Sequence, residues 1–278
     1  MAELDLTQAA EIATQLAREA GAILSDFQTR PFQQIQKSNE NDIVTEADRA
    51  AEAVIIAGLQ QHFPDHYLVG EESGGVGESF ENAEYLWYID PLDGTTNFAN
   101  HIPAFSVSIA LVNSQHEPLV GVVYAPLFNE MFLAIRGQGV TLNGQPIKVG
   151  EKQTLGSCVV ASGFPYIKAT SADNNLAEWA AMLVRTRDLR RFGSAALDLC
   201  YVAAGRFDGY WEQLINPWDF LAGVLCVQEA GGTASDYEGL TNGGFYQGRR
   251  VVAANPNIHA QMLKVIQEAR ADLPEKSV

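Results

Sequence analysis

Cysteine and histidine are both scarce in this sequence. The three cysteines, Cys158, Cys200 and Cys226, lie far apart and form no C-x-x-C pair. We therefore expect buried thiols in a reducing compartment. Of the five histidines, only His62 and His66 lie close together, with Pro64 between them, and we expect no metal site built on histidine.

Long apolar runs and positive charge are also in short supply. No apolar run reaches the ~18 residues that span a membrane, and the acidic residues 1–5 lack the basic region of a signal peptide. We therefore expect a cytoplasmic protein. A formal net charge of −16 makes the surface repel nucleic acids and anionic lipids. It also repels an anionic substrate, unless local cations or oriented amides reverse the field at the site.

The rest of the composition is typical of a globular protein with a large core. The chain has 278 residues, of which 47% are hydrophobic and 19% are charged. That length is near the upper limit for one core. We predict a single compact domain, 1–278, made of two halves at about 1–152 and 153–278. The first half is expected to hold an antiparallel sheet, and the second half an α/β unit.

Hydrophobic periodicity predicts alternating helices and strands. Helices are predicted at 5–28, 45–63, 176–187, 193–205, 217–231 and from 256 onward. Strands are predicted at 67–70, 85–89, 105–111, 119–124, 131–135, 157–161, 207–213, 233–236 and 250–254. For the helix at 176–187, the expected buried face is Leu176, Trp179, Ala180 and Leu183.

Turn signals complete this picture. Asn143-Gly144 is a strong hairpin signal, so the block 104–149 is predicted to be antiparallel. Residues 74–84 are rich in glycine and glutamate and are predicted to form a mobile loop.

The stretch 85–98 carries the strongest functional signal. A strand-like run leads into Asp90 and Asp93, with Pro91 between them. Proline fixes its own φ and keeps the preceding residue extended. Asp90 is therefore expected at a strand end, with Asp93 folded back toward it. Gly94 lets the backbone approach a ligand, so the amides that follow it are able to face an anion.

Two carboxylates held so close together repel each other. At ~4 Å and an effective dielectric constant of about 20, the repulsion is about 4 kcal/mol. No Lys or Arg lies between Glu84 and Asn100, so a bound hard cation is the simplest partner. Carboxylate and carbonyl oxygens suit Mg²⁺ or Mn²⁺ better than Zn²⁺. The alternative is a turn whose Asp side chains cap the backbone, and these two residues alone do not decide between the two.

Two further acids occupy the same kind of position. Glu71 and Asp219, like Asp90 and Asp93, lie at a strand end or a helix start. Acids in such positions often converge at one rim of a layered fold. Four carboxylates gathered there are able to hold two or three Mg²⁺ ions, the arrangement that clamps both oxygens in a phosphoryl transfer.

The motifs around these acids resemble those of the inositol monophosphatase family, most closely its bacterial branch. They are Gly-Glu-Glu-Ser at 70–73, Asp-Pro-Leu-Asp-Gly-Thr-Thr-Asn-Phe at 90–98, Gly-Ser-Ala-Ala at 193–196, Trp-Glu at 211–212 and Pro-Trp-Asp-Phe-Leu-Ala-Gly at 217–223. The run from Asn41 to Asp48, preceded by Lys37, also matches. The order and spacing agree over nearly the whole chain.

The resemblance implies two to three Mg²⁺ ions per subunit, with Mn²⁺ as a substitute. Glu71, Asp90 and the Leu92 carbonyl would hold the first ion. Asp90, Asp93 and Asp219 would hold the second. A third, weaker ion would involve Glu71 and mostly water.

The resemblance also implies roles in substrate binding and catalysis. Thr95 and Glu71 would orient the attacking water, and Asp93 belongs with them to the catalytic set. The implied substrate-binding residues are Leu92, Asp93, Gly94, Thr95, Gly193, Ser194, Ala195, Glu212 and Asp219. The amides of Gly94 and Thr95 would receive the phosphate. The Glu212 carboxylate would accept hydrogen bonds from the hydroxyls of a polyol.

Asp48 has two interpretations. Its position three residues after Thr45 favours a helix capping pair. The resemblance implies instead that Asp48, Lys37 and Thr96 support the site from behind, with Asp48 positioning Thr95.

The fold and activity implied by the resemblance are specific. The fold would be an α/β layered αβαβα sandwich, with a mostly antiparallel N-terminal sheet and a second C-terminal sheet. The activity would be Mg²⁺-dependent hydrolysis of inositol 1-phosphate by direct attack of water, inhibited by lithium, in a homodimer. Alternatives are the same chemistry on histidinol phosphate, fructose bisphosphate or nucleotide-derived phosphates, and a protein partner in the transcription machinery. An aspartyl-phosphate phosphatase of the haloacid dehalogenase type is a weaker alternative, because its two acids are two positions apart rather than three.

Overall fold

The computed structural model describes residues 4–30, 32, 34–36, 43–77 and 79–271. Within them, eight strands form the larger sheet, in the order β10-β9-β8-β7-β6-β5-β3-β4. Their bounds are β3 Tyr67–Gly70, β4 Gly74–Val76, β5 Tyr85–Asp93, β6 Ser106–Asn113, β7 Pro118–Ala125, β8 Glu130–Ile135, β9 Gly139–Leu142 and β10 Gln145–Pro146. Only the β3–β5 pair is parallel among these described strands. The predicted antiparallel character of this block is confirmed.

The second sheet comes from the C-terminal half of the chain. Its described strands lie in the order β12-β11-β13-β15-β14. Their bounds are β11 Val159–Ser162, β12 Asp188–Arg190, β13 Gly209–Gln213, β14 Thr233–Ser235 and β15 Arg250–Ala254. The sheet is mixed, because β11 pairs parallel with β12 and β13, while β15 pairs antiparallel with β13 and β14. A small ladder of β1, Gln34–Gln36, and β2, Ile43–Thr45, completes the strands.

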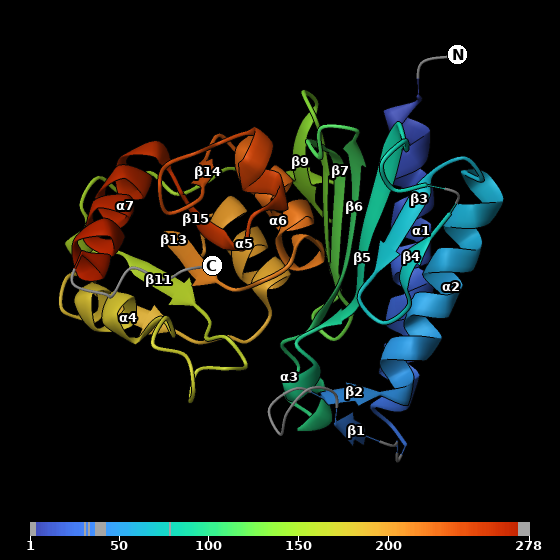
Figure 1. Cartoon of the computed structure of the whole chain (residues 1–278), viewed down its shortest axis with the longest axis horizontal. Helices are drawn as coiled ribbons and strands as arrows, with labels where there is room; N and C mark the ends of the chain where they lie inside the picture. The colour runs from blue at the N-terminus through green and yellow to red at the C-terminus, as the bar shows by residue number, and fades with distance from the viewer. Residues whose placement is uncertain (1–3, 31, 33, 37–42, 78, 272–278) are drawn as a thin grey trace.

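Helices cover both sheets and fill the space between them (Figure 1). Their bounds are α1 Leu6–Phe27, α2 Glu46–His62, α3 Thr95–Ala99, α4 Leu176–Leu183, α5 Ala195–Ala203, α6 Pro217–Glu229 and α7 Pro256–Arg270, with short 3₁₀ turns η1 Leu155–Ser157 and η2 Gly243–Gln247. In Figure 1, α1 and α2 lie outside the larger sheet, α5 and α6 lie between the sheets, and α4 and α7 lie outside the smaller sheet. The αβαβα sandwich is therefore confirmed.

The layers arise because successive side chains of a strand point to opposite faces. Leu86 and Tyr88 of β5 belong to the core shared with α5, α6 and the second sheet. Trp87 and Ile89 belong to the core beneath α1 and α2. A third core packs the far face of the second sheet against α7 and Met182 of α4. β5 is thus buried on both faces, which explains its almost uninterrupted apolar sequence.

The helix starts follow the capping rules that the sequence suggested. Asp5 caps α1 by accepting hydrogen bonds from two backbone amides. Thr45 and Asp48 form the capping box of α2.

Asn143 and Gly144 both have positive φ, at 49° and 77°, as the predicted tight hairpin requires. No helix in the described part of the chain is long and apolar enough to cross a membrane.

The structure overturns most of the predicted inward face of α4, which comprised Leu176, Trp179, Ala180 and Leu183. Of these four, Trp179 alone packs against the third core, where it is partly buried. Leu176 and Leu183 are 58% and 52% exposed, and Ala180 is exposed as well. Glu178 and Met182 point inward instead. The reason is an ion pair between Glu178 and Arg270 of α7, which gives a charged residue a buried position that apolar periodicity assigned to leucine.

The prediction of one mobile loop over 74–84 is also wrong in part. Gly74–Val76 forms β4 and pairs antiparallel with β3, so this segment extends the larger sheet. Its two glycines and short length hid the strand, because Gly is depleted in strands. None of the described residues of 74–84 lines the main cavity.

The contact between β7 and α6 joins the larger sheet to the helices of the middle layer, and it depends on Gly121. A Cβ atom at this position would lie 2.6 Å from the Ala222 carbonyl oxygen and 3.0 Å from its Cα. We expect Gly121→Ala to destabilise the protein by about 1–3 kcal/mol, because the helix backbone must move away. Thermal unfolding followed by circular dichroism measures this loss.

Gly156→Ala is the matched control, since its added Cβ would lie 3.8 Å from the nearest atom. Equal melting temperatures for the two variants would contradict the proposed close packing of β7 on α6.

Candidate active site

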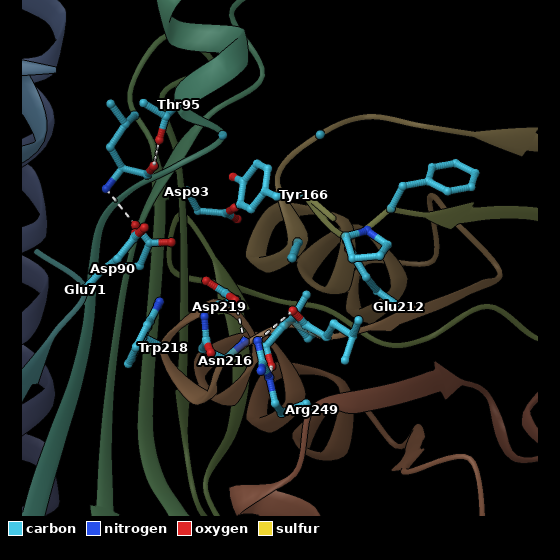
Figure 2. Close-up of a pocket in the computed structure, with 18 of the residues that line it drawn as sticks. Glu71, Asp90, Asp93, Thr95, Tyr166, Glu212, Asn216, Trp218, Asp219 and Arg249 are labelled. Atoms are coloured by element: carbon cyan, nitrogen blue, oxygen red, sulfur yellow. Dashed lines mark hydrogen bonds between the residues drawn. The ribbon is translucent and has the colours of Figure 1, made fainter. Parts of the chain in front are cut away.

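A cavity of about 480 Å³ lies where the two halves of the sandwich meet. It is lined by Glu71, Asp90, Leu92, Asp93, Gly94, Thr95, Phe164, Pro165, Tyr166, Ile167, Arg191, Gly193, Ala195, Glu212, Leu214, Ile215, Asn216, Trp218, Asp219 and Arg249. The four acids predicted as metal ligands therefore share one cavity (Figure 2). They come from three segments that are separate in sequence: Glu71 follows β3, Asp90 and Asp93 end β5, and Asp219 lies in the first turn of α6.

A β-bulge aims Asp90 and Asp93 at the same cavity. In a regular strand, residues three apart point to opposite faces. On β5, Asp90 pairs with Ser108 and Asp93 pairs with Ser106, so three steps on one strand oppose two on the other. The extra residue lies next to Pro91, which has no N–H to donate to the ladder. The bulge thus turns the second carboxylate toward the first.

Each of these carboxylates is held by donors from the backbone or a hydroxyl. Asp90 accepts a hydrogen bond from the Leu92 amide at 2.9 Å. Asp93 accepts hydrogen bonds from the Ser194 hydroxyl at 2.6 Å and from the Ala196 amide at 2.7 Å. Asp93 therefore bonds directly to the start of α5, which ties β5 to the second half of the chain.

Asp219 reaches the cavity from the first turn of α6. It occupies the third helical position, where its carboxylate accepts a hydrogen bond from the Asn216 amide at 2.6 Å. Pro217 begins the helix without needing an amide partner. The Pro-Trp-Asp order thus combines a helix start with a carboxylate placed at the cavity.

Glu71 is positioned by a buried acid that the sequence interpretation missed. Glu52 of α2 is 3% exposed, and its carboxylate accepts hydrogen bonds from the amides of Glu72 at 2.9 Å and Ser73 at 2.7 Å. A Cβ at Gly70 would lie 2.6 Å from a Glu52 oxygen. Gly70 therefore lets Glu52 hold the turn that presents Glu71. The sequence did contain a signal for Glu52, because this glutamate falls on the apolar face of α2, beside Ala51 and Ile55.

Burial and mutual repulsion raise the pKa values of the acids in the cavity. Burial, followed by the charges of Glu71, Asp93 and Asp219, raises the pKa of Asp90 well above its usual range. Burial and the Glu71 charge raise the pKa of Asp219 in the same way. Burial raises the pKa of Asp93 to about 7, against the hydrogen bonds from Ser194 and the α5 amides. These acids are costly to ionise together unless cations join them.

The donor set fits a hard divalent cation. The ligands that meet at the cavity are carboxylate and carbonyl oxygens, which suit Mg²⁺ and Mn²⁺ rather than softer metals. Among the described residues, no three acidic, cysteine or histidine side chains are already arranged around one ion position. The carboxylates instead turn toward neighbouring backbone and hydroxyl donors.

Thr95 follows the tight turn at Gly94. Gly94 has a φ of 100°, and a Cβ there would lie 3.0 Å from the Ala104 carbonyl oxygen, so this position requires glycine. The Thr95 hydroxyl donates to the Leu92 carbonyl at 3.2 Å and lies 3.4 Å from an Asp48 oxygen. Asp48 therefore does both things considered for it, since it also completes the α2 capping box. Burial raises its pKa to about 6.

Glu212 closes the cavity from the second sheet. It lies on β13 next to Gly163, where a Cβ would overlap the carboxylate at 2.0 Å. The Tyr210 hydroxyl donates to the Glu212 carboxylate. Burial raises the pKa of Glu212, and the nearby Arg191 charge opposes that rise.

The comparison with known families matches this arrangement. The model of the inositol monophosphatase family matches residues 5–271. The chain belongs to the inositol monophosphatase family. This membership removes the haloacid dehalogenase alternative, and it makes the chain one of a family of phosphatases.

Relatives cover almost the whole chain. The inositol-1-monophosphatase of Synechocystis is 42% identical over 94% of this chain and 90% of its own length. The Nus factor SuhB of Pasteurella multocida is 42% identical over 94% of this chain and 96% of its own length. The structure of the Anabaena inositol monophosphatase, 41% identical, superposes with a TM-score of 0.85 and covers 95% of this chain and 97% of that one.

The other predicted family positions divide into four groups. Gly193 and Ala195 line the cavity. Ser194 is buried beside it and acts through its hydrogen bond to Asp93. Thr96 is exposed, and it does not line the cavity. Lys37 lies outside the described residues.

The sequence interpretation missed the residues that form the outer part of the inositol monophosphatase cavity. They are Phe164, Pro165, Tyr166, Ile167, Arg191, Leu214, Ile215, Asn216, Trp218 and Arg249. Arg191 and Arg249 are cations in an otherwise acidic cavity, of the kind that an anionic substrate requires. Because several of these residues stand next to the recognised motifs in the sequence, we could have expected those near the cavity. The sequence does not show which of their side chains point into it.

The raised pKa of Asp93 has a measurable consequence for the metal-free protein. An acid with a higher pKa in the folded state adds stability below pH 3.8, and this contribution is lost as the pH rises through about 7. We expect Asp93→Asn in chelator at pH 7.5 to be more stable than the unsubstituted chain, by roughly 1–4 kcal/mol. The difference should close at pH 4. Denaturant unfolding at both pH values measures it.

Glu11→Gln, at an exposed position of α1, is the control for this measurement. An Asp93→Asn protein that is less stable than the unsubstituted chain at pH 7.5 would show that the Asp93 carboxylate is not strained by its neighbours.

Proposed function

We propose that this chain is a Mg²⁺-dependent phosphomonoesterase that hydrolyses inositol 1-phosphate to inositol and phosphate. The observation that carries the proposal is the shared cavity of Glu71, Asp90, Asp93 and Asp219. Their crowding requires cations, and their oxygens suit Mg²⁺. Family membership and the inositol-1-monophosphatase relatives support the reaction class and the substrate.

The proposed ligand assignment is the one that the family resemblance implies. Glu71, Asp90 and the Leu92 carbonyl would hold one ion, and Asp90, Asp93 and Asp219 a second. An Mg²⁺ ion held by these residues would offset the phosphate charge and would supply hydroxide near neutral pH. Two or three ions per subunit, with Mn²⁺ as a substitute, fit the number of oxygens.

The chain's own residues position the reactants. Glu71 and Thr95 orient the attacking water, and the contact of Thr95 with Asp48 and the Leu92 carbonyl holds its hydroxyl at the cavity. The amides of Gly94 and Thr95 receive the phosphate. Water attacks phosphorus directly, because the four clustered acids are assigned to the metal ions and Glu212 to the polyol, which leaves no carboxylate as a nucleophile.

The polyol part of the substrate faces the second half of the chain. Glu212 is held in place by the Tyr210 hydroxyl, and its carboxylate accepts hydrogen bonds from two adjacent hydroxyls. Gly193, Ser194 and Ala195 line or support the same side. The bond between Ser194 and Asp93 couples this side to the metal ligands.

Asp219→Asn tests the ligand assignment. We expect phosphate release from inositol 1-phosphate to fall at least about 100-fold, because one carboxylate of the ion clamp is lost. Millimolar Mg²⁺ should raise the melting temperature of the unsubstituted chain and raise that of the variant less. Glu11→Gln should behave as the unsubstituted chain in both assays. Near-normal turnover in a folded Asp219→Asn protein would refute the assignment.

A panel of esters tests the substrate. Inositol 1-phosphate, histidinol phosphate, fructose bisphosphate and a nucleotide-derived phosphate are assayed with Mg²⁺, with and without lithium. We expect the highest kcat/KM for inositol 1-phosphate, and inhibition by lithium. A different preferred ester would move the proposal to that substrate, with the same chemistry.

The names of several relatives favour a second candidate function. Proteins called Nus factor SuhB are up to 42% identical to this chain over 94% of its length. An additional protein partner in the transcription machinery is therefore a second proposal. Affinity purification at physiological salt, with identification of the bound proteins, tests it.

A homodimer also remains a proposal, which light scattering on the purified chain checks.

A further inference from the structure

The segment between β11 and α4 forms one side of the cavity. Four consecutive residues, from Phe164 to Ile167, line it. Tyr166 lines the same cavity as Asp93 and Asp219, and Figure 2 shows it among the labelled residues of the cavity. No sequence motif considered above includes this tyrosine.

The N-terminal end of this segment is fixed by a buried asparagine. Asn175 adopts a positive φ of 70° and is fully buried. Its amide nitrogen donates to the Gly163 carbonyl at 2.6 Å, and its oxygen accepts from the Trp211 indole at 2.7 Å. Gly163 is in turn held against Glu212, since no side chain fits between them. The chain that leads to Tyr166 therefore starts from a defined point beside the substrate-facing carboxylate.

The C-terminal end of the segment is fixed by ion pairs. Asp173 lies 2.8 Å from an Arg270 nitrogen and 3.1 Å from an Arg250 nitrogen. These pairs lower the pKa of Asp173 to about 2, although its partial burial opposes the shift. Arg270 belongs to α7 and Arg250 to β15. Both anchors belong to the rigid second half, so the segment projects from a fixed base.

The Tyr166 side chain lines the cavity together with the four acids. Its hydroxyl is neutral near pH 7, because the ordinary pKa of a tyrosine is about 10. The residue is 52% exposed, so a molecule that enters the cavity is able to reach it. A neutral phenol beside acceptors is a hydrogen-bond donor. Once cations balance the carboxylates, the strongest acceptors brought into the cavity are phosphate oxygens.

We propose that Tyr166 contacts the substrate, with its hydroxyl donating a hydrogen bond to the phosphate and its ring limiting the size of the alcohol group. This inference rests on the proposed phosphatase function and names a specificity-determining residue for it. The ring narrows the cavity on the side formed by the segment between β11 and α4. Small polyol esters therefore fit beside it, and broad aromatic esters meet it.

The hydroxyl is tested by binding of inorganic phosphate in the presence of Mg²⁺, measured by calorimetry. We expect Tyr166→Phe to weaken binding about tenfold, the loss expected for one hydrogen bond to a charged group. Tyr124→Phe is the matched control, because Tyr124 lies on β7 away from the cavity. Binding by Tyr166→Phe within twofold of the unsubstituted chain would overturn the hydroxyl contact.

The ring is tested by the ratio of kcat/KM for 4-nitrophenyl phosphate to that for inositol 1-phosphate. Tyr166→Ala should raise this ratio at least fivefold, whereas Tyr166→Phe should leave it unchanged. An unchanged ratio in Tyr166→Ala would overturn the size-limiting role. Circular dichroism melting confirms that each variant is folded.

These arms separate the two proposals. If the unsubstituted chain binds phosphate with Mg²⁺ but does not hydrolyse inositol 1-phosphate, the proposed substrate fails, and the phosphate comparison still decides the Tyr166 hydroxyl. The ring is then tested with the ester from the panel that the chain hydrolyses best. A chain that binds no phosphate with Mg²⁺ overturns both proposals.

Discussion

The mutual repulsion of buried carboxylates is the constraint on which the rest of this structure depends. Asp90 and Asp219 lie in one cavity with Glu71 and Asp93, and burial with neighbouring charge raises their pKa values well above the usual range. Such a site persists only because the surrounding fold forces the acids together. The bulge on β5, the Glu52 brace behind Glu71 and the capping box of α6 each fix one acid in place. The same electrostatic repulsion is reduced when divalent cations bind between the carboxylates.

The layered fold brings the repelling carboxylates into one cavity. β5 is buried on both faces and cannot shift its register without exposing apolar side chains on one of them. Its end therefore delivers Asp90 and Asp93 at a fixed depth. α5 and α6 start beside that end, and Asp93 bonds to the first turn of α5. Glu71, Asp90 and Asp93 come from the first half, while Asp219, Glu212 and Tyr166 come from the second half. The reaction would take place at the junction between the halves.

Prediction from sequence succeeded where local chemistry and burial agree. The capping box at Thr45, the hairpin at Asn143-Gly144 and the double-sided strand before Asp90 have short-range causes, and all three are present. The prediction failed for α4, because the inward Glu178 is stabilised by Arg270, which lies 92 residues away. It failed for β4, because a three-residue glycine-rich strand forms only where β3 offers a partner. The prediction also missed Glu52. Its carboxylate oxygens accept hydrogen bonds from the amides of Glu72 and Ser73, in a turn that is separate from α2.

The sequence by itself determined the chemical kind of this protein. Its acids stand next to the residues that set strand ends and helix starts, and its motifs identified the inositol monophosphatase family. Only the tertiary structure decided which side chains meet. A bulge reverses the direction of one carboxylate, and long-range ion pairs hold the segment of Tyr166 over the cavity. The physical reason is that backbone propensity acts over a few residues, whereas the direction of a side chain depends on partners that only the packed layers bring near.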